Sequence, residues 1–74
     1  MSWVREAPSV LVHESGLRVH LTELPDGGLD VETDDGSMAA WSAFEQARGV
    51  PLHDLQARAQ RLVREAAKWH DENP

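Results

Sequence analysis

The strongest structural signal in the chain lies in residues 51–70, whose sequence is PLHDLQARAQRLVREAAKWH. Apolar side chains recur there at steps of three and four residues, which places them on one stripe of an α-helix. The stripe consists of Leu52, Leu55, Ala59, Leu62, Ala66 and Trp69. Pro51 suits the first helical position, because its missing N–H would be unpaired there in any case. The sequence therefore predicts a long amphipathic helix from Pro51 to His70, with opposite charges four residues apart on its polar face forming ion pairs.

A second, shorter helix is predicted directly before the long one. Ser37 is a suitable N-cap residue, and the two acids that precede it complement the positive end of a helix dipole. Gly49 provides the conformational freedom that the C-terminal end of a helix often requires. We therefore expect a helix from Ser37 to about Arg48, with Trp41 as one of its large apolar residues.

Two stretches upstream alternate in the manner of half-buried strands, namely residues 17–22 and residues 29–34. The sequence PDGG at residues 25–28 joins them and suits a hairpin turn, because proline fixes φ and glycine adopts positive φ. A third strand is predicted at the apolar run of residues 10–12, which a glycine-containing turn separates from residue 17. Residues 9–34 are thus expected to form a three-stranded antiparallel β-meander.

The predicted fold class is α+β, with the element order βββαα and both helices packed on one face of the sheet. The expected organisation is an N-terminal tail of residues 1–8, a single α+β domain of residues 9–71 and a C-terminal tail of residues 72–74. The expected core consists of Val10, Val12, Leu17, Val19, Leu21, Leu29, Val31, Trp41, Phe44, Leu52, Leu55, Ala59, Leu62, Val63, Ala66 and Trp69.

Length and composition narrow the class of protein. A domain of 74 residues buries only about 60% of its unfolded surface, so a second subunit would add burial and we expect a homodimer. The chain has no cysteine, which excludes disulfides and thiolate metal sites and fits a reducing compartment. No apolar run approaches the roughly 18 residues of a membrane span, and the N-terminus lacks the pattern of a signal peptide. The predicted location is the cytoplasm.

The negative charge of the chain is unevenly distributed. The net charge is −6, and residues 37–74 hold equal numbers of acids and bases, so all of it lies in residues 1–36. The candidate partner-binding residues are the six acids of a segment without bases, Glu23, Asp26, Asp30, Glu32, Asp34 and Asp35. Affinity for nucleic acid or anionic membrane rests on Lys and Arg, so the predicted partner is a protein with a basic surface. The alternative is a solvated acidic face that keeps a sheet edge soluble.

The sequence contains no pattern that indicates catalysis, a cofactor or a metal. The four histidines, His13, His20, His53 and His70, lack the spacing of a zinc site. A calcium loop starting at Asp30 fails, because Asp35 and Trp41 stand where an EF-hand needs glycine and glutamate. No serine lies in a glycine-flanked turn of the kind that presents a nucleophile. We therefore expect a protein that is not an enzyme.

The element order predicted for residues 29–67 resembles that of ribbon-helix-helix regulators, which have a strand, a helix, a turn and a second helix. Residues 48–55, RGVPLHDL, would form the turn and open the second helix. The resemblance implies a dimeric DNA-binding protein whose strand enters the DNA groove with basic or amide side chains. Asp30, Glu32 and Asp34 stand on that strand here and have the wrong charge for DNA, so the chain is not assigned to the family.

These observations favour a small acidic protein that binds another protein and inhibits or modulates it. The charge pattern fits a bacterial, phage or mobile-element product that acts on a nucleic-acid-handling protein, of the anti-CRISPR or DNA-mimic type. The alternative is a dimeric transcriptional regulator or antitoxin, for which only the stripe Arg58, Arg61, Arg64 and Lys68 could contact DNA. A third alternative is a small accessory enzyme, which would need a pocket with convergent polar groups.

Overall fold

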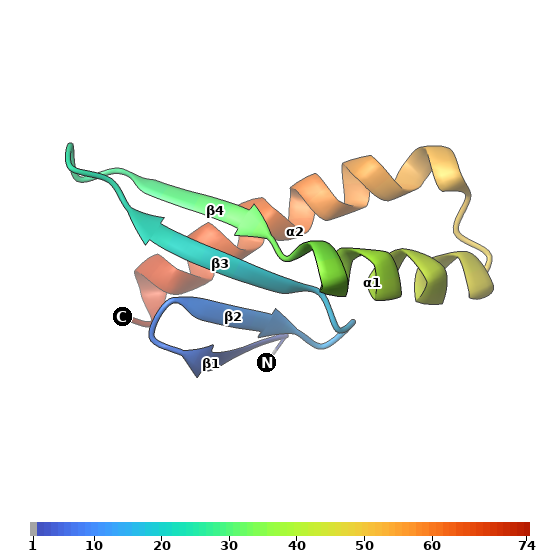
Figure 1. Cartoon of the computed structure of the whole chain (residues 1–74), viewed down its shortest axis with the longest axis horizontal. Coiled ribbons are helices and arrows are strands. Elements are labelled where there is room, and N and C mark those ends of the chain that lie inside the picture. The colour runs from blue at the N-terminus through green and yellow to red at the C-terminus, as the bar shows by residue number, and fades with distance from the viewer. Residues whose placement is uncertain (1) are drawn as a thin grey trace.

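The structure, a computed structural model that describes residues 2–74, consists of a four-stranded antiparallel sheet followed by two helices (Figure 1). The strands are β1 (Trp3–Ala7), β2 (Val10–His13), β3 (Arg18–Glu23) and β4 (Leu29–Thr33), and they lie in the order β1-β2-β3-β4. The helices are α1 (Asp35–Ala47) and α2 (Leu52–Glu72). The α+β class is confirmed, but the expectation of three strands is wrong, because the sheet has four.

The additional strand is β1, which lies within the segment that the sequence analysis treats as a tail. Arg5 stands opposite Leu11 of β2, and the register shifts between Arg5 and Ala7. The Arg5 guanidinium donates a hydrogen bond of 2.8 Å to the carbonyl of Asn73, the C-cap of α2, and lies 3.0 Å from Nδ1 of His70 in the last turn of that helix. The sequence pattern does not predict β1, because this short strand has one large buried side chain, Trp3, and shows no alternation of apolar and polar residues.

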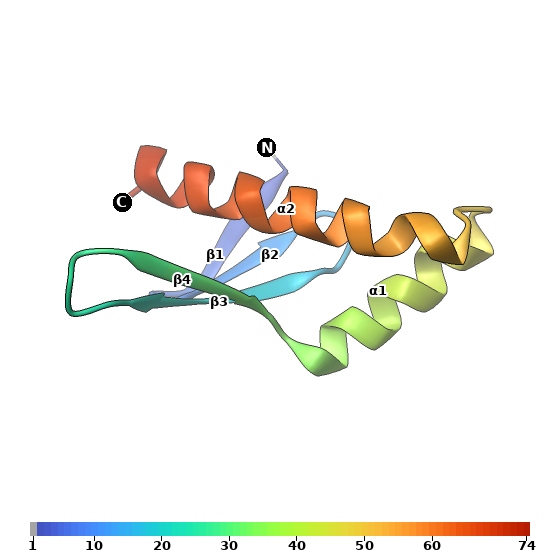
Figure 2. The ribbon, with the colours of Figure 1, turned by 90° about the horizontal axis from the view of Figure 1, so that it is seen from above.

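The two helices take different places relative to the sheet. Figure 2 shows α2 lying across one face of the sheet, while α1 continues beyond the end of β4 and packs beside the N-terminal part of α2. The expectation that both helices cover one sheet face therefore holds for α2 alone. The long helix is shifted slightly from its predicted bounds, because Pro51 is its N-cap and its last residue is Glu72.

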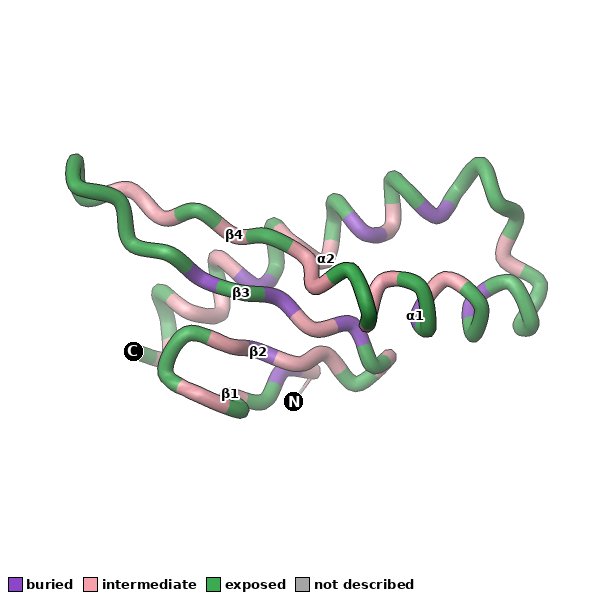
Figure 3. Tube along the Cα trace, viewed as in Figure 1, coloured by how far each residue is buried: buried purple, intermediate pink, exposed green. Residues whose placement is uncertain are grey.

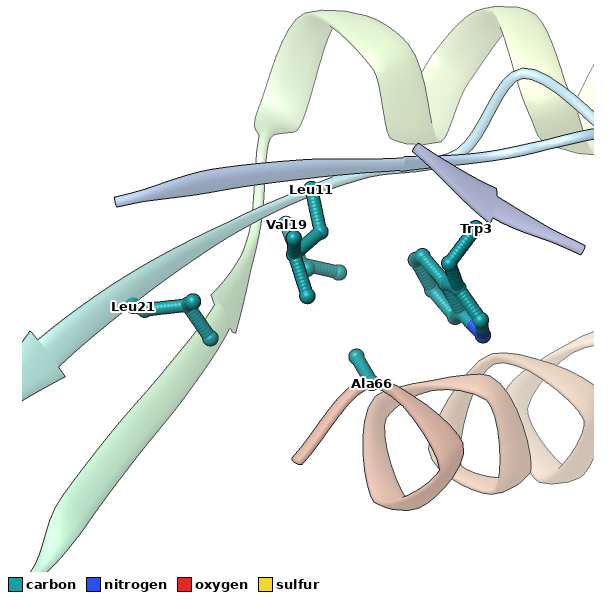
Figure 4. Packing of buried hydrophobic residues seen from close by; sticks show 5 residues of the cluster. All are labelled: Trp3, Leu11, Val19, Leu21 and Ala66. Carbon is teal, nitrogen blue, oxygen red and sulfur yellow. The ribbon is translucent and has the colours of Figure 1, made fainter. Parts of the chain in front are cut away.

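Two adjoining groups of buried side chains form the core. The first joins the sheet to α2 and consists of Trp3, Leu11, Val19, Leu21 and Ala66 (Figure 4). The second joins α1 to α2 and consists of Leu17, Trp41, Leu55 and Ala59. Leu62 packs against both groups from the middle of α2. The predicted helical stripe therefore supplies one continuous seam that holds the sheet and α1 together.

Several residues of the expected core lie elsewhere. In β2 the buried side chain is Leu11, which is 0% exposed, whereas Val10 and Val12 point to the other face of the sheet and are only half-buried. In a run of three consecutive apolar residues, sequence alone does not show whether the middle residue or its two neighbours face the core. Leu11 faces the core because it pairs with Val19, and residues directly opposite each other point to the same face of the sheet. Phe44 of α1 is 51% exposed, because α2 covers only one side of α1, and Leu52 is 71% exposed at the first position of α2.

The junction of α1 and α2 contains a buried carboxylate. Glu45 is fully buried, its Oε1 accepts a hydrogen bond of 3.2 Å from Nη1 of Arg48, and its Oε2 lies 2.6 Å from Nη2 of Arg58. The second contact is an ion pair that is not aligned as a good hydrogen bond. Arg58 therefore binds across the helix junction. The expected ion pairs between opposite charges four residues apart on α2 are absent from residues 2–74.

Truncation of β2 side chains tests which face of the strand is buried. Leu11→Ala should lower the free energy of unfolding by about 2–5 kcal/mol, because it leaves a cavity between the sheet and α2. Val12→Ala, one residue away on the other face, should cost clearly less. Denaturant unfolding followed by circular dichroism measures both changes. A larger loss for Val12→Ala than for Leu11→Ala would show that the assigned strand parity is wrong.

A double-mutant cycle tests the buried ion pair. Arg58→Met should lower the free energy of unfolding by about 1–3 kcal/mol, because the buried Glu45 carboxylate loses a charged partner while the aliphatic packing stays. Glu45→Met together with Arg58→Met should recover part of that loss, because no buried charge then remains. If the loss of unfolding free energy in the double variant equals the sum of the losses in the two single variants, the two side chains do not interact.

Candidate functional site

The face of the sheet opposite α2 carries no helix and presents the acids of β4. Asp30 stands opposite Thr22 and Glu32 opposite His20, and both carboxylates are exposed. Neither has an ion-pair partner among residues 2–74. Like charges two residues apart on one strand face repel each other, so these two carboxylates are available to a partner of opposite charge.

Asp34, the third acid predicted for this face, has a structural role instead. Its Oδ2 accepts a hydrogen bond of 3.0 Å from the backbone N–H of Ser37, and its Oδ1 lies 3.1 Å from Nε2 of His20. The hydrogen bond from the Ser37 N–H is the larger cause that lowers the pKa of Asp34 below the ordinary value of an aspartate, and the contact with His20 lowers it further. Asp34 is therefore the N-cap of α1, and the prediction that Ser37 caps this helix is wrong.

Ser37 instead joins α1 to the sheet. Its hydroxyl accepts a hydrogen bond of 2.9 Å from the backbone N–H of Arg18 and lies 3.0 Å from the carbonyl oxygen of Asp34. Because Arg18 begins β3, this contact places the start of α1 at the end of the sheet. Both residues have N-cap chemistry, and sequence alone could not tell which of the two would serve.

The remaining three predicted acids differ in their surroundings. Asp26 accepts a hydrogen bond of 2.8 Å from the N–H of Gly28 and so stabilises the hairpin turn, in which Gly27 has a φ of 88°. Glu23 is exposed at the end of β3, and Asp35 is exposed at the start of α1. Figure 3 draws the hairpin between β3 and β4 as exposed. Asp30 and Glu32 thus share the open face of the sheet as carboxylates with no structural bond in the described residues. Glu23 pairs with Leu29 and, by strand alternation, points to the other face, where it lines a hollow with Arg5 and His70.

An open groove of about 610 Å³ lies beside this hairpin, between β4, the start of α1 and α2. Its apolar wall consists of Val31, Met38, Ala59 and Val63. Its polar side chains are Glu32, Thr33, Asp35, Gln56, Gln60 and Arg64. Sequence reasoning missed the groove, because it forms only where α2 leaves the edge of the sheet uncovered.

Three bases of α2 have no ion-pair partner in residues 2–74, and one of them, Arg64, lines the groove beside the acidic hairpin. Arg18 pairs with Glu6 at 2.9 Å, and Arg58 is engaged with Glu45. Arg61 and Lys68 are exposed on α2 and have no ion-pair partner in the described part of the chain. Arg61 and Lys68 do not line this groove, and α2 covers the face of the sheet opposite Asp30 and Glu32 (Figure 2).

Residues 2–74 contain no group of three or more histidine and carboxylate side chains that could hold a metal ion. Over the same residues, neither helix is long and apolar enough to cross a membrane. Comparison of the chain with protein families, curated proteins and solved structures finds no match. The hairpin, its outer edge and the adjacent groove are therefore the features of the molecule that bear on its function.

Replacement of Asp34 by alanine tests its capping role through pH. Because the pKa of folded Asp34 lies below its ordinary value, the ionised carboxylate stabilises the fold above that ordinary value, and this contribution is lost as the pH falls through the lowered folded-state pKa. Asp34→Ala should therefore lower the free energy of unfolding at neutral pH, and the difference from wild type should shrink in acid. Denaturant unfolding at a series of pH values measures this difference.

The matched control is Asp30→Ala, which removes an exposed carboxylate from the same hairpin without removing a cap. It should leave the free energy of unfolding at neutral pH unchanged or slightly raised, because it relieves repulsion with Glu32. A loss of stability equal to that of Asp34→Ala would contradict the special role of Asp34.

Proposed function

We propose that this protein is a non-enzymatic binding protein that docks on a basic surface of another protein through the exposed carboxylates of the β3–β4 hairpin and thereby inhibits or modulates it. The observation that carries the proposal is the pair Asp30 and Glu32 on the open face of the hairpin, which is exposed and has no ion-pair partner in residues 2–74. Glu23, on the other face of the same hairpin, is also exposed and unpaired in these residues. Complementary charge raises the association rate and selects against partners of like charge.

The charge distribution also supports a particular kind of partner. A basic surface that normally binds nucleic acid would attract the same carboxylates, so a nucleic-acid-handling protein is the proposed target. An inhibitor of the anti-CRISPR or DNA-mimic type, encoded by a bacterium, phage or mobile element, is the form of this proposal that the net charge of −6 favours. Cytoplasmic location and self-association into a homodimer remain predictions from the sequence.

Affinity capture with charge variants tests the proposal. The variant Glu23→Gln/Asp30→Asn/Glu32→Gln keeps the shape of the hairpin and removes three negative charges. Asp34 is left intact, because its replacement would also remove the cap of α1. Binding of a partner captured from the cells that encode the protein should weaken by at least tenfold, which corresponds to about 1.4 kcal/mol. Added salt should weaken the wild type more than the variant.

The control variant is Arg61→Gln/Lys68→Gln, which alters charge on the exposed side of α2 without touching the Glu45 ion pair. It should leave capture of the partner nearly unchanged. If this variant abolishes binding and the hairpin variant does not, the interaction surface is α2. The regulator alternative would then replace the proposed function.

A further inference from the structure

The outer edge of β4 has free backbone hydrogen-bonding groups. Hydrogen-bonded pairs alternate along an antiparallel ladder. The pairing is anchored at one end by the bond from Asp34 N–H to the Arg18 carbonyl and at the other by the bond from Leu24 N–H to the Gly28 carbonyl. Because hydrogen-bonded positions recur at every second residue, the backbone N–H and C=O groups of Asp30 and Glu32 bond to β3. The N–H and C=O groups of Leu29, Val31 and Thr33 therefore point away from the sheet.

The side chains next to this edge define two different environments. On the exposed face, the edge is lined by the carboxylates of Asp30 and Glu32. On the other face lies the groove of about 610 Å³ whose wall includes Val31, Met38 and Val63. A strand added to β4 would direct alternate side chains to these two environments, because successive residues of a strand point to opposite faces.

We propose that β4 is a strand-addition site, and that it binds an extended antiparallel segment of a partner in which basic and apolar residues alternate. The basic side chains would lie beside Asp30 and Glu32, and the apolar ones would enter the groove. Main-chain hydrogen bonds to Val31 and Thr33 would supply affinity, and the alternating environments would supply specificity. This inference rests on the proposed function, since it names the form in which the basic partner binds the hairpin.

Charge argues against a second copy of this chain as the occupant. If two β4 strands paired antiparallel about a two-fold axis at Val31, Asp30 of each protomer would stand opposite Glu32 of the other. Like charges directly opposite on neighbouring strands are destabilising. A basic strand in the same position converts both repulsions into attractions.

The other edge of the sheet is less suited to the same role. β1 has a register irregularity between Arg5 and Ala7, and bulges of this kind interrupt regular pairing and protect edge strands. The pairing of β4 with β3 is regular from Leu29 to Thr33. β4 is therefore the edge at which a partner strand can continue the sheet.

Backbone-methylated peptides test the binding mode with the wild-type protein. The probe is an end-blocked peptide of alternating lysine and valine, compared with one form N-methylated at the valines and another N-methylated at the lysines. In an antiparallel addition with valines facing the groove, the valine N–H groups face β4. Methylation of the valines should weaken binding at least tenfold relative to methylation of the lysines, although charge and composition are identical.

Amide hydrogen exchange locates the contact. The amides of Val31 and Thr33 should gain protection when the unmethylated peptide is added, whereas those of Asp30 and Glu32 are already bonded to β3. On the protein side, Thr33→Pro removes one free N–H at the edge and should weaken binding, whereas Thr33→Val keeps the N–H and should bind as well as wild type. If Thr33→Pro fails to fold, the methylated peptides still decide.

Two results would overturn the inference. Equal binding of the two methylated peptides, combined with loss of binding in Asp30→Asn/Glu32→Gln, would leave docking through charge intact and exclude strand addition. Binding that leaves the exchange of Val31 and Thr33 unchanged would also exclude it. The proposed function has a separate test. It would be wrong if the wild type and the hairpin charge variant captured the cellular partner equally well.

Discussion

Close packing of α2 on the sheet is the contact on which the rest of the structure depends. The helix presents alanine at two buried positions of its apolar stripe, Ala59 and Ala66, and side chains this small let a helix approach its neighbours closely. Ala66 packs with Trp3, Leu11 and Val19 of three different strands, and Ala59 packs with Trp41 of α1. One helix thus joins the sheet and α1, and burial in so small a domain is concentrated along this seam.

A single helix on a four-stranded sheet leaves the opposite face and both outer edges uncovered. That arrangement explains why the acids of the hairpin are exposed and why a groove opens beside β4. An uncovered edge favours unwanted strand pairing, and inward or adjacent charges are a common protection against it. In the proposed binding mode, the carboxylates of Asp30 and Glu32 would oppose pairing of two β4 strands and attract a basic strand, so both effects would have one electrostatic origin.

The acidic residues of this chain have different structural roles, and the environment of each carboxylate, not its residue type, sets that role. Glu45 is fully buried, binds Arg48 at the end of its own helix and binds Arg58 across the junction with α2. Asp34 caps α1 and contacts His20. Asp30 and Glu32, four and two residues before Asp34, have no ion-pair partner within the described residues and face solvent. Net charge alone does not distinguish these roles, because each depends on which backbone and side-chain groups the fold brings near the carboxylate.

Local sequence patterns are sufficient to predict the α+β class, the β3–β4 hairpin and the long helix, because the periodicity of apolar residues and the turn chemistry at residues 25–28 are local properties. They also locate the acidic hairpin. Only the tertiary structure decided that β1 completes the sheet, that Leu11 and not Val12 faces the core, and that Glu45 is buried. It also assigned the capping role to Asp34 and created the groove beside β4. These features depend on pairing and packing between residues far apart in the chain, which a local pattern does not contain.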